Sequence, residues 1–151
     1  MVQMKSALGG IPVSKAMITD FRSLRPSDSL EQAIEHVLAG FQLDFPVLEQ
    51  GRLVGVLTRG DLLKNLAQKG RQARVVEAMN ERFEIADPSE MLELALARLQ
   101  SCHCRTLPVL RRGDLVGVLT MDNVGEFLMI QSALRGDARA GGMGIAARLE
   151  Q

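Results

Sequence analysis

The sequence predicts an α/β fold of the α+β kind, in which two β-α-β-β-α repeats pack about a pseudo-twofold axis. The first supporting observation is internal repetition, because a shift of 62 residues, from Pro26 to Pro88, aligns two halves of the chain without a gap. The second is that apolar residues in each half occur at helical spacing and then in short continuous runs. The third is size, because a unit of about 50 to 60 residues is marginal as an independent fold. We therefore expect the two repeats to bury their open sheet faces against each other.

The clearest matches between the two halves are two short segments. Phe45-Pro46-Val47-Leu48 aligns with Leu107-Pro108-Val109-Leu110. The Gly-x-Leu-Val-Gly-Val-Leu-Thr run of residues 51–58 recurs at residues 113–120. Two matches in the same register are far more than chance produces, so the halves are copies of one unit.

The alignment also sets the domain boundaries. We place repeat 1 at residues 11–68 and repeat 2 at residues 73–134. Residues 135–151 are rich in Gly and Ala and have few apolar anchors, so we expect a flexible tail there.

The first predicted elements of each copy are a strand and a helix. The strand is expected before the first helix, around Val13 in repeat 1. After Pro26, apolar residues at helical spacing predict a helix that contains Leu30, Ala33, Ile34, Val37 and Leu38. Polar residues 27–29 offer N-cap side chains, and Gly40 is suited to end the helix.

A hairpin and a second helix follow in each copy. Residues 45–48 form a short apolar run typical of a buried strand, and the Gly-containing polar segment 49–52 predicts a tight turn. Residues 53–57 are predicted as the returning strand, in which Gly55 indicates a close backbone approach. A second helix is expected to begin near Thr58.

Composition excludes several classes of function. The chain has 18 basic and 18 acidic residues, so it lacks the basic field that attracts nucleic acid or anionic membranes. Trp and Tyr are absent, which removes the stacking platforms used to bind single strands. We find no signal peptide and no apolar run of the roughly 18 to 20 residues that a membrane span needs. Cys102 and Cys104 are too close in sequence for a good structural disulfide, which favours a reducing, cytoplasmic setting.

The repeated order, with a Pro-Val strand and then Gly-Val-Leu-Thr followed by Asp or Asn three residues later, resembles the CBS (cystathionine-beta-synthase) domain family. The resemblance covers residues 11–134 and implies a CBS pair, or Bateman module. In that family the two repeats form a disc with two clefts, which commonly hold AMP, ADP, ATP or S-adenosylmethionine. The resemblance also implies homodimers, a regulatory role without catalysis, and no required cofactor.

Three further segments are similar to a subset of this family. They are residues 14–21, 44–47 and 123–130. The subset lies at the cytosolic C-terminal end of bacterial site-2-type intramembrane zinc metalloproteases. The resemblance implies that the chain is a fragment covalently attached to a membrane protease domain. The His-Glu-x-x-His helix of such proteases is absent here, so this part cannot carry their chemistry.

The candidate binding motif is Thr58-x-x-Asp61 with its copy Thr120-x-x-Asn123. Each Thr ends a strand and opens a helix, where unpaired backbone N–H groups suit a phosphate. A carboxylate three residues later could accept both hydroxyls of a ribose, while the amide of Asn123 would bind differently. The alternative is a capping box that only stabilises the helix start.

The family resemblance implies further ligand contacts at three places in each copy. The apolar ones would sandwich an adenine, and their alternative role is ordinary core packing. These positions are Val13 and Ser14, Val75 and Val76, Leu43 and Asp44, Arg105 and Thr106, and Val56 and Val118.

Arg105 and Asp44 make the two copies unequal. A guanidinium that faces a cleft would pair with a phosphate, whereas a carboxylate would repel it. We therefore expect only one cleft to suit a charged nucleotide. The alternative for Arg105 is a surface salt bridge.

Other motifs do not support an enzyme or a metal site. Cys102-His103-Cys104 supplies too few ligands for zinc, with only His36 left to add. No Ser-His-Asp set, P-loop or paired-carboxylate motif is present, so we expect no catalytic residues.

The last helix carries a wide apolar surface between Val124 and Leu134. We expect this surface, with the helix around Leu62 to Leu66, to form a homodimer contact, the alternative being packing within one chain. Together these observations predict a module that binds an adenine nucleotide or related adenosyl ligand and controls an attached or partner protein. The alternative function is a structural dimerisation or docking module with empty clefts.

Overall fold

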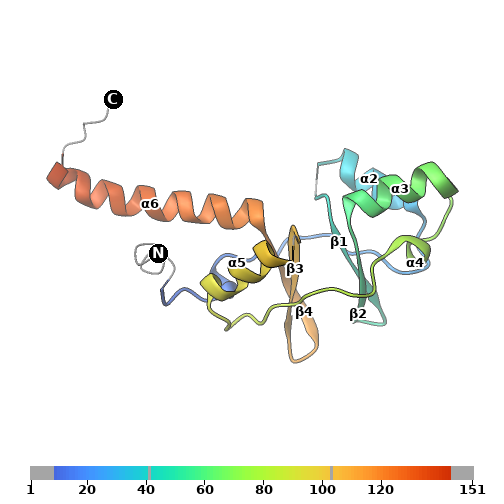
Figure 1. The fold of residues 1–151 in the computed structure, drawn as a ribbon, viewed down its shortest axis with the longest axis horizontal. Helices are drawn as coiled ribbons and strands as arrows, with labels where there is room; N and C mark the ends of the chain where they lie inside the picture. Colours follow the sequence, from blue (N-terminus) through green and yellow to red (C-terminus); the bar gives the residue numbers. More distant parts are fainter. Residues whose placement is uncertain (1–8, 41, 103, 144–151) are drawn as a thin grey trace.

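The structure is a computed structural model that describes residues 9–40, 42–102 and 104–143, with side chains described as far as residue 136 (Figure 1). Two similar units lie side by side. The first unit contains α2 (Leu30–Leu38), β1 (Phe45–Glu49), β2 (Arg52–Leu57) and α3 (Arg59–Lys69). The second contains α5 (Leu92–Ser101), β3 (Thr106–Arg111), β4 (Asp114–Thr120) and α6 (Met121–Met143). The predicted α/β fold of two repeats is therefore confirmed.

Each repeat has one antiparallel hairpin, as the sequence predicts. β1 pairs with β2 and β3 pairs with β4. The turns contain Gln50-Gly51 and Arg112-Gly113, and all four residues have positive φ. Two consecutive residues of positive φ are typical of the tight turn that matches the twist of a β-hairpin. The same turn chemistry thus fixes the register of both hairpins.

The two cores exchange their N-terminal segments. The 3₁₀ helix η1 (Val13–Lys15) lies before repeat 1 in sequence, yet Val13 packs with Leu92 and Leu107 in the core of repeat 2. The short helix α4 (Val75–Ala78) likewise brings Val75 into the core of repeat 1 with Phe45. Each core is completed by a segment that belongs to the other half of the sequence.

Backbone pairs continue this exchange next to the hairpins. Ile18 exchanges two hydrogen bonds with Val118 of β4, and Asn80 does the same with Val56 of β2. The strand expected around Val13 is therefore wrong at that position. Val13 and its copy lie in short helices because their side chains turn into the opposite core. Extended pairing of these segments with the hairpins begins at Ile18 and Asn80.

Glycine permits this close approach, as the sequence predicts for Gly55. A Cβ at Gly55 would lie 2.7 Å from Met79 Sδ and 3.2 Å from the Asn80 carbonyl oxygen. A Cβ at Gly117 would lie 2.7 Å from Met17 Sδ and 2.9 Å from the Ile18 carbonyl oxygen. No side chain fits at such distances, so glycine lets the exchanged segment pair with each hairpin.

The C-terminal helix is longer than the sequence suggests. α6 extends from the body of the molecule as a single rod and ends at Met143, beyond the expected start of a flexible tail at residue 135 (Figure 1). Ala and Arg are strong helix formers and outweigh the glycines in this stretch. The rest of the predicted tail, residues 144–151, lies outside the described part of the chain.

Two further observations concern the cysteines and the membrane. Cys102 and Cys104 form a disulfide with their Cα atoms 5.1 Å apart, so the expectation of unpaired thiols is wrong. Cys102 is the C-cap residue of α5, and the distance between the two Cα atoms lies within the usual disulfide range. Among the described helices, none combines the length and apolarity required to cross a membrane.

Candidate functional site

Two cavities lie between the repeats, one beside each Thr that opens a helix. The Thr58 cavity has a volume of about 590 Å³, and its walls include Val56, Thr58, Arg59, Arg82 and Phe83. The Thr120 cavity has a volume of about 200 Å³, and its walls include Ile18, Asp20, Phe21, Val118, Thr120 and Asp122. Asp44, Arg105 and Thr106 line both cavities. The larger volume falls within the range of about 300 to 1,000 Å³ typical of ligand pockets, and the smaller falls below it.

The two Thr hydroxyls cap their helices. Thr58 Oγ1 accepts a hydrogen bond of 3.1 Å from the Asp61 amide, and Thr120 Oγ1 accepts one of 3.0 Å from the Asn123 amide. These are the N-cap bonds from the Thr side of the capping box given as the alternative. Each hydroxyl keeps its hydrogen, which can still be donated to a ligand oxygen.

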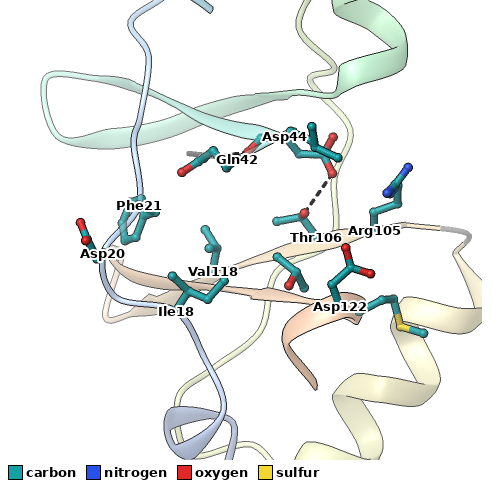
Figure 2. A pocket seen from close by; sticks show the side chains of 12 residues that line it. Ile18, Asp20, Phe21, Gln42, Asp44, Arg105, Thr106, Val118 and Asp122 are labelled. Carbon is teal, nitrogen blue, oxygen red and sulfur yellow. Dashed lines mark hydrogen bonds between the residues drawn. The ribbon is translucent and has the colours of Figure 1, made fainter. Parts of the chain in front are cut away.

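Asp44 lines both cavities, and Figure 2 shows its side chain pointing toward Thr106 in the Thr120 cavity. Its side chain is 7% exposed, which makes it the buried acidic residue of the described chain. One carboxylate oxygen accepts from the Arg59 amide at 2.9 Å, and the other accepts from the Thr106 hydroxyl at 3.0 Å. A buried carboxylate needs such donors, and here they come from both repeats.

Asn123 and Asp61 have different surroundings although they occupy equivalent positions. The side-chain amide of Asn123 donates to the carbonyl oxygen of Ala16, directly after η1. A carboxylate such as that of Asp61 cannot donate this bond. Neither residue is part of a cavity wall. The amide of Asn123 thus anchors the exchanged N-terminal segment.

The structure brings together about half of the candidate residues. Those that line one or both cavities are Thr58, Thr120, Asp44, Val56, Arg105, Thr106 and Val118, with Leu43 in the Thr120 cavity. Val13 and Val75 are fully buried in the cores, because η1 and α4 turn them inward. Ser14 lies outside all the described cavities. Val76 lines a separate surface hollow with Arg25 and Arg74.

Sequence reasoning missed the wall that the exchanged segments supply. Ile18, Asp20 and Phe21 line the Thr120 cavity, while their copies Asn80, Arg82 and Phe83 line the Thr58 cavity. The signal was present, because Phe21 and Phe83 align in the two repeats. An apolar residue conserved between copies, yet outside any predicted helix or strand, could have indicated this wall.

Arg105 also differs from its expected placement. It borders both cavities, as does Asp44, so the two residues do not belong to separate clefts. Its side chain is exposed and makes no ion pair with any described residue. Across the described residues no group of three or more His, Cys, Asp or Glu side chains could hold a metal ion.

The fold and the paired cavities are those of a module built from two repeats that share their cores. Comparison with protein families agrees, since the CBS domain model matches residues 13–68 and 75–129. The chain belongs to the CBS domain family.

Individual relatives support the same assignment. The CBS domain-containing protein YhcV of Bacillus subtilis is 27% identical over 114 residues, which cover 74% of this chain and 81% of that protein. The solved structure of CBSX2 in complex with AMP is 29% identical, covers 81% of this chain and 99% of that one, and has a TM-score of 0.69. CBSX2 is a protein of Arabidopsis thaliana.

A more distant neighbour shares the fold. The CBS domain pair of protein MJ0100, solved with 5′-methylthioadenosine and S-adenosyl-L-methionine, is 19% identical with a TM-score of 0.71, and covers 78% of this chain and 95% of that one. Two other curated relatives, 26% and 25% identical, are much longer, and this chain spans 24% of the length of each.

Proposed function

We propose that this CBS pair is a regulatory module that binds an adenine nucleotide, or a related adenosyl ligand, between its repeats and controls an attached or partner protein. The observation that carries the proposal is the pair of cavities bounded by both repeats and by a Thr-opened helix. CBSX2, which is 29% identical, was solved with AMP. The ligands we expect are AMP, ADP, ATP or S-adenosylmethionine.

The residues of the Thr58 cavity suit the parts of a nucleotide. In the first turn of α3, the Asp44 carboxylate accepts a hydrogen bond from the Arg59 amide, and Thr58 Oγ1 accepts one from the Asp61 amide. The Gly60 amide is left to donate to a phosphate oxygen. Val56 and Phe83 offer apolar contact for a base. Thr58, Asp61, Thr120 and Asn123 remain our candidates for contacts to the phosphate and ribose. Asp61 and Asn123, which line neither cavity, would need to turn toward the ligand.

Binding would act by shifting the balance between arrangements of the two repeats. A ligand in either cavity touches both repeats, because Asp44 and Thr106 come from opposite halves. It would favour the arrangement in which both sets of contacts form, by no more than its difference in affinity for the two states. An attached or neighbouring protein would respond to this change.

The experiment is a thermal and chemical unfolding series with AMP, ADP, ATP and S-adenosylmethionine. A ligand at 100 times its dissociation constant should raise the free energy of unfolding by about 2.7 kcal/mol. The matched control is Arg52→Asp, which changes an exposed residue at the far end of the first hairpin and should retain the effect. If no adenosine compound stabilises the protein at millimolar concentration, the proposal is wrong.

A structural dimerisation or docking module with empty cavities is the second candidate function. The observation in its favour is the outer side of α6, where Met129, Ile130 and Leu134 are 67%, 57% and 60% exposed. Leu63 on α3 is 53% exposed and belongs to the other helix proposed for the contact. A homodimer would cover such side chains. Sedimentation of the wild type and of Ile130→Glu tests it, since only the wild type should associate.

We also propose that this module belongs to a larger parent protein and lies in the cytoplasm. Residues 14–21, 44–47 and 123–130 support an origin at the cytosolic end of a site-2-type membrane metalloprotease. The longer curated relatives show that a module of this kind occurs as a minor part of larger proteins. Sequencing the coding region upstream of Met1 tests this, because a protease origin requires a His-Glu-x-x-His segment there.

A further inference from the structure

The Thr58 cavity is lined by three guanidinium groups. Arg59 comes from the first turn of α3, Arg82 from the exchanged segment and Arg105 from the start of the second hairpin. Within the described residues none of these three side chains makes a hydrogen bond or ion pair. Three arginines that line one cavity without protein partners are suited to an anion, since guanidinium groups bind phosphate in a bidentate manner.

The two carboxylates of this cavity bond to groups other than the three guanidinium groups. Glu84 bonds to Arg98 at 3.2 Å, and Arg98 lies outside the cavity. Asp44 accepts from the Arg59 amide and the Thr106 hydroxyl. The three arginines outnumber the two carboxylates that line the same cavity, and neither carboxylate forms an ion pair with them.

The Thr120 cavity has the opposite balance. Asp20, Asp44 and Asp122 line it against the single Arg105 (Figure 2). Figure 2 shows Asp20 and Asp122 near opposite ends of the cavity, with Ile18 and Val118 between them. A phosphate placed here would meet a carboxylate at either end, which costs binding energy in a partly buried site.

The charge reversal occurs at equivalent positions of the repeats. A shift of 62 residues takes Asp20 to Arg82, and the same shift takes Gly60 to Asp122. The backbone frame of the two cavities is thus alike, while the charged side chains differ. The cavity volumes differ in the same direction, about 590 Å³ for the basic cavity and about 200 Å³ for the acidic one.

We propose that the two cavities sort adenosyl ligands by charge: the Thr58 cavity binds the phosphate-bearing ligand, and the Thr120 cavity excludes phosphate and is left for adenosine compounds that lack it. This inference rests on the proposed function for the adenosine group. The part about phosphate depends only on the arginines and aspartates named above. One chain should therefore bind one AMP, at the cavity formed by Arg59, Arg82 and Arg105.

Calorimetric titration with AMP tests the site. The wild type should bind one AMP per chain, and Arg82→Asp should weaken binding about 10- to 100-fold, the usual loss for a charge-assisted hydrogen bond. Arg52→Asp, an equal change of charge on an exposed hairpin turn, should bind as the wild type does. Two AMP molecules per chain, or equal binding by Arg82→Asp, would overturn the charge assignment and leave the proposed function intact.

Inorganic pyrophosphate separates this inference from the adenosine proposal. In ¹⁵N-labelled protein it should shift the amide signals of residues 58–60 and 82–84 while those of residues 120–122 stay in place. Asp20→Arg combined with Asp122→Gly gives the Thr120 cavity the residues found at the equivalent positions 82 and 60, so pyrophosphate should then shift residues 120–122 as well. Shifts at both cavities or at neither in the wild type, or no gain in the double variant, would contradict the sorting by charge. If pyrophosphate behaves as expected but no adenosine compound binds, only the proposed function fails.

Discussion

Asp44 and Thr106 occupy equivalent positions in the two repeats and bond directly to each other, with the Thr106 hydroxyl donating to the Asp44 carboxylate over 3.0 Å. The contact therefore lies where the pseudo-twofold axis relates the halves. The other carboxylate oxygen accepts a hydrogen bond from the Arg59 amide at the start of α3. One side chain thus joins the repeats and occupies part of the helix end that would otherwise face an anion.

Replacing Asp44 by Asn should separate these two effects. The Asn oxygen can accept from the Arg59 amide and its NH₂ group can donate to Thr106 Oγ1, so both bonds survive and the free energy of unfolding should fall by less than about 1 kcal/mol. Loss of the negative charge should tighten AMP binding several-fold. Asp44→Ala leaves both partners without a bond and should cost about 1 to 3 kcal/mol. Urea unfolding and calorimetry measure the two quantities, and weaker AMP binding by Asp44→Asn would contradict the argument.

The close approach at Gly117 gives a second prediction. An added Cβ would meet Met17 Sδ at 2.7 Å and the backbone oxygen of Ile18 at 2.9 Å, so Gly117→Ala must displace the exchanged segment and should cost about 1 to 3 kcal/mol. Gly125 lies in α6 with nothing within 4 Å of an added Cβ. Gly125→Ala should therefore stabilise the protein by up to about 1 kcal/mol. Urea unfolding of both variants tests the pair, and equal effects would refute it.

Helix caps provide a third prediction. Thr120 Oγ1 accepts the Asn123 amide, so Thr120→Ala should cost about 1 kcal/mol of folding free energy, while Thr120→Ser should keep most of it. The equivalent change Thr58→Ala removes the matching bond to the Asp61 amide and should cost a similar amount. Denaturant titration measures each loss. A Ser variant as unstable as the Ala variant would show that the hydroxyl does not act as a cap.

Much of the fold follows from the sequence because its signals are local. Helical spacing after Pro26 predicts α2, and the apolar runs around the Gly-containing turns predict both hairpins. Gly55 indicates a close backbone approach, which the contact with Asn80 confirms. The family follows because the matches between the repeats extend over most of the chain.

The parts that sequence reasoning missed depend on contacts between residues far apart. Nothing local in the segment around Val13 shows that it packs into the core of the other repeat, which is why a strand was expected there. Asp20 in the wall of the Thr120 cavity and Arg82 in the wall of the Thr58 cavity were missed for the same reason, since their positions follow from the exchange. The disulfide between Cys102 and Cys104 was missed because sequence spacing alone does not reveal that their Cα atoms lie 5.1 Å apart.

The exchange of N-terminal segments leads to a prediction about cooperativity. Val13 is fully buried in the core of repeat 2, so Val13→Ala removes packing there and should cost about 2 kcal/mol. Because Val75 completes the core of repeat 1 in return, neither core is whole without the other half. Hydrogen exchange of Val13→Ala should therefore show faster exchange for amides of β1 and β2 as well as β3 and β4, in one global unfolding event. Lys15→Ala, an exposed neighbour in η1, serves as the control and should leave protection unchanged. Loss of protection confined to β1 and β2 would mean that Val13 belongs to its own repeat, and the shared cores would then be wrong.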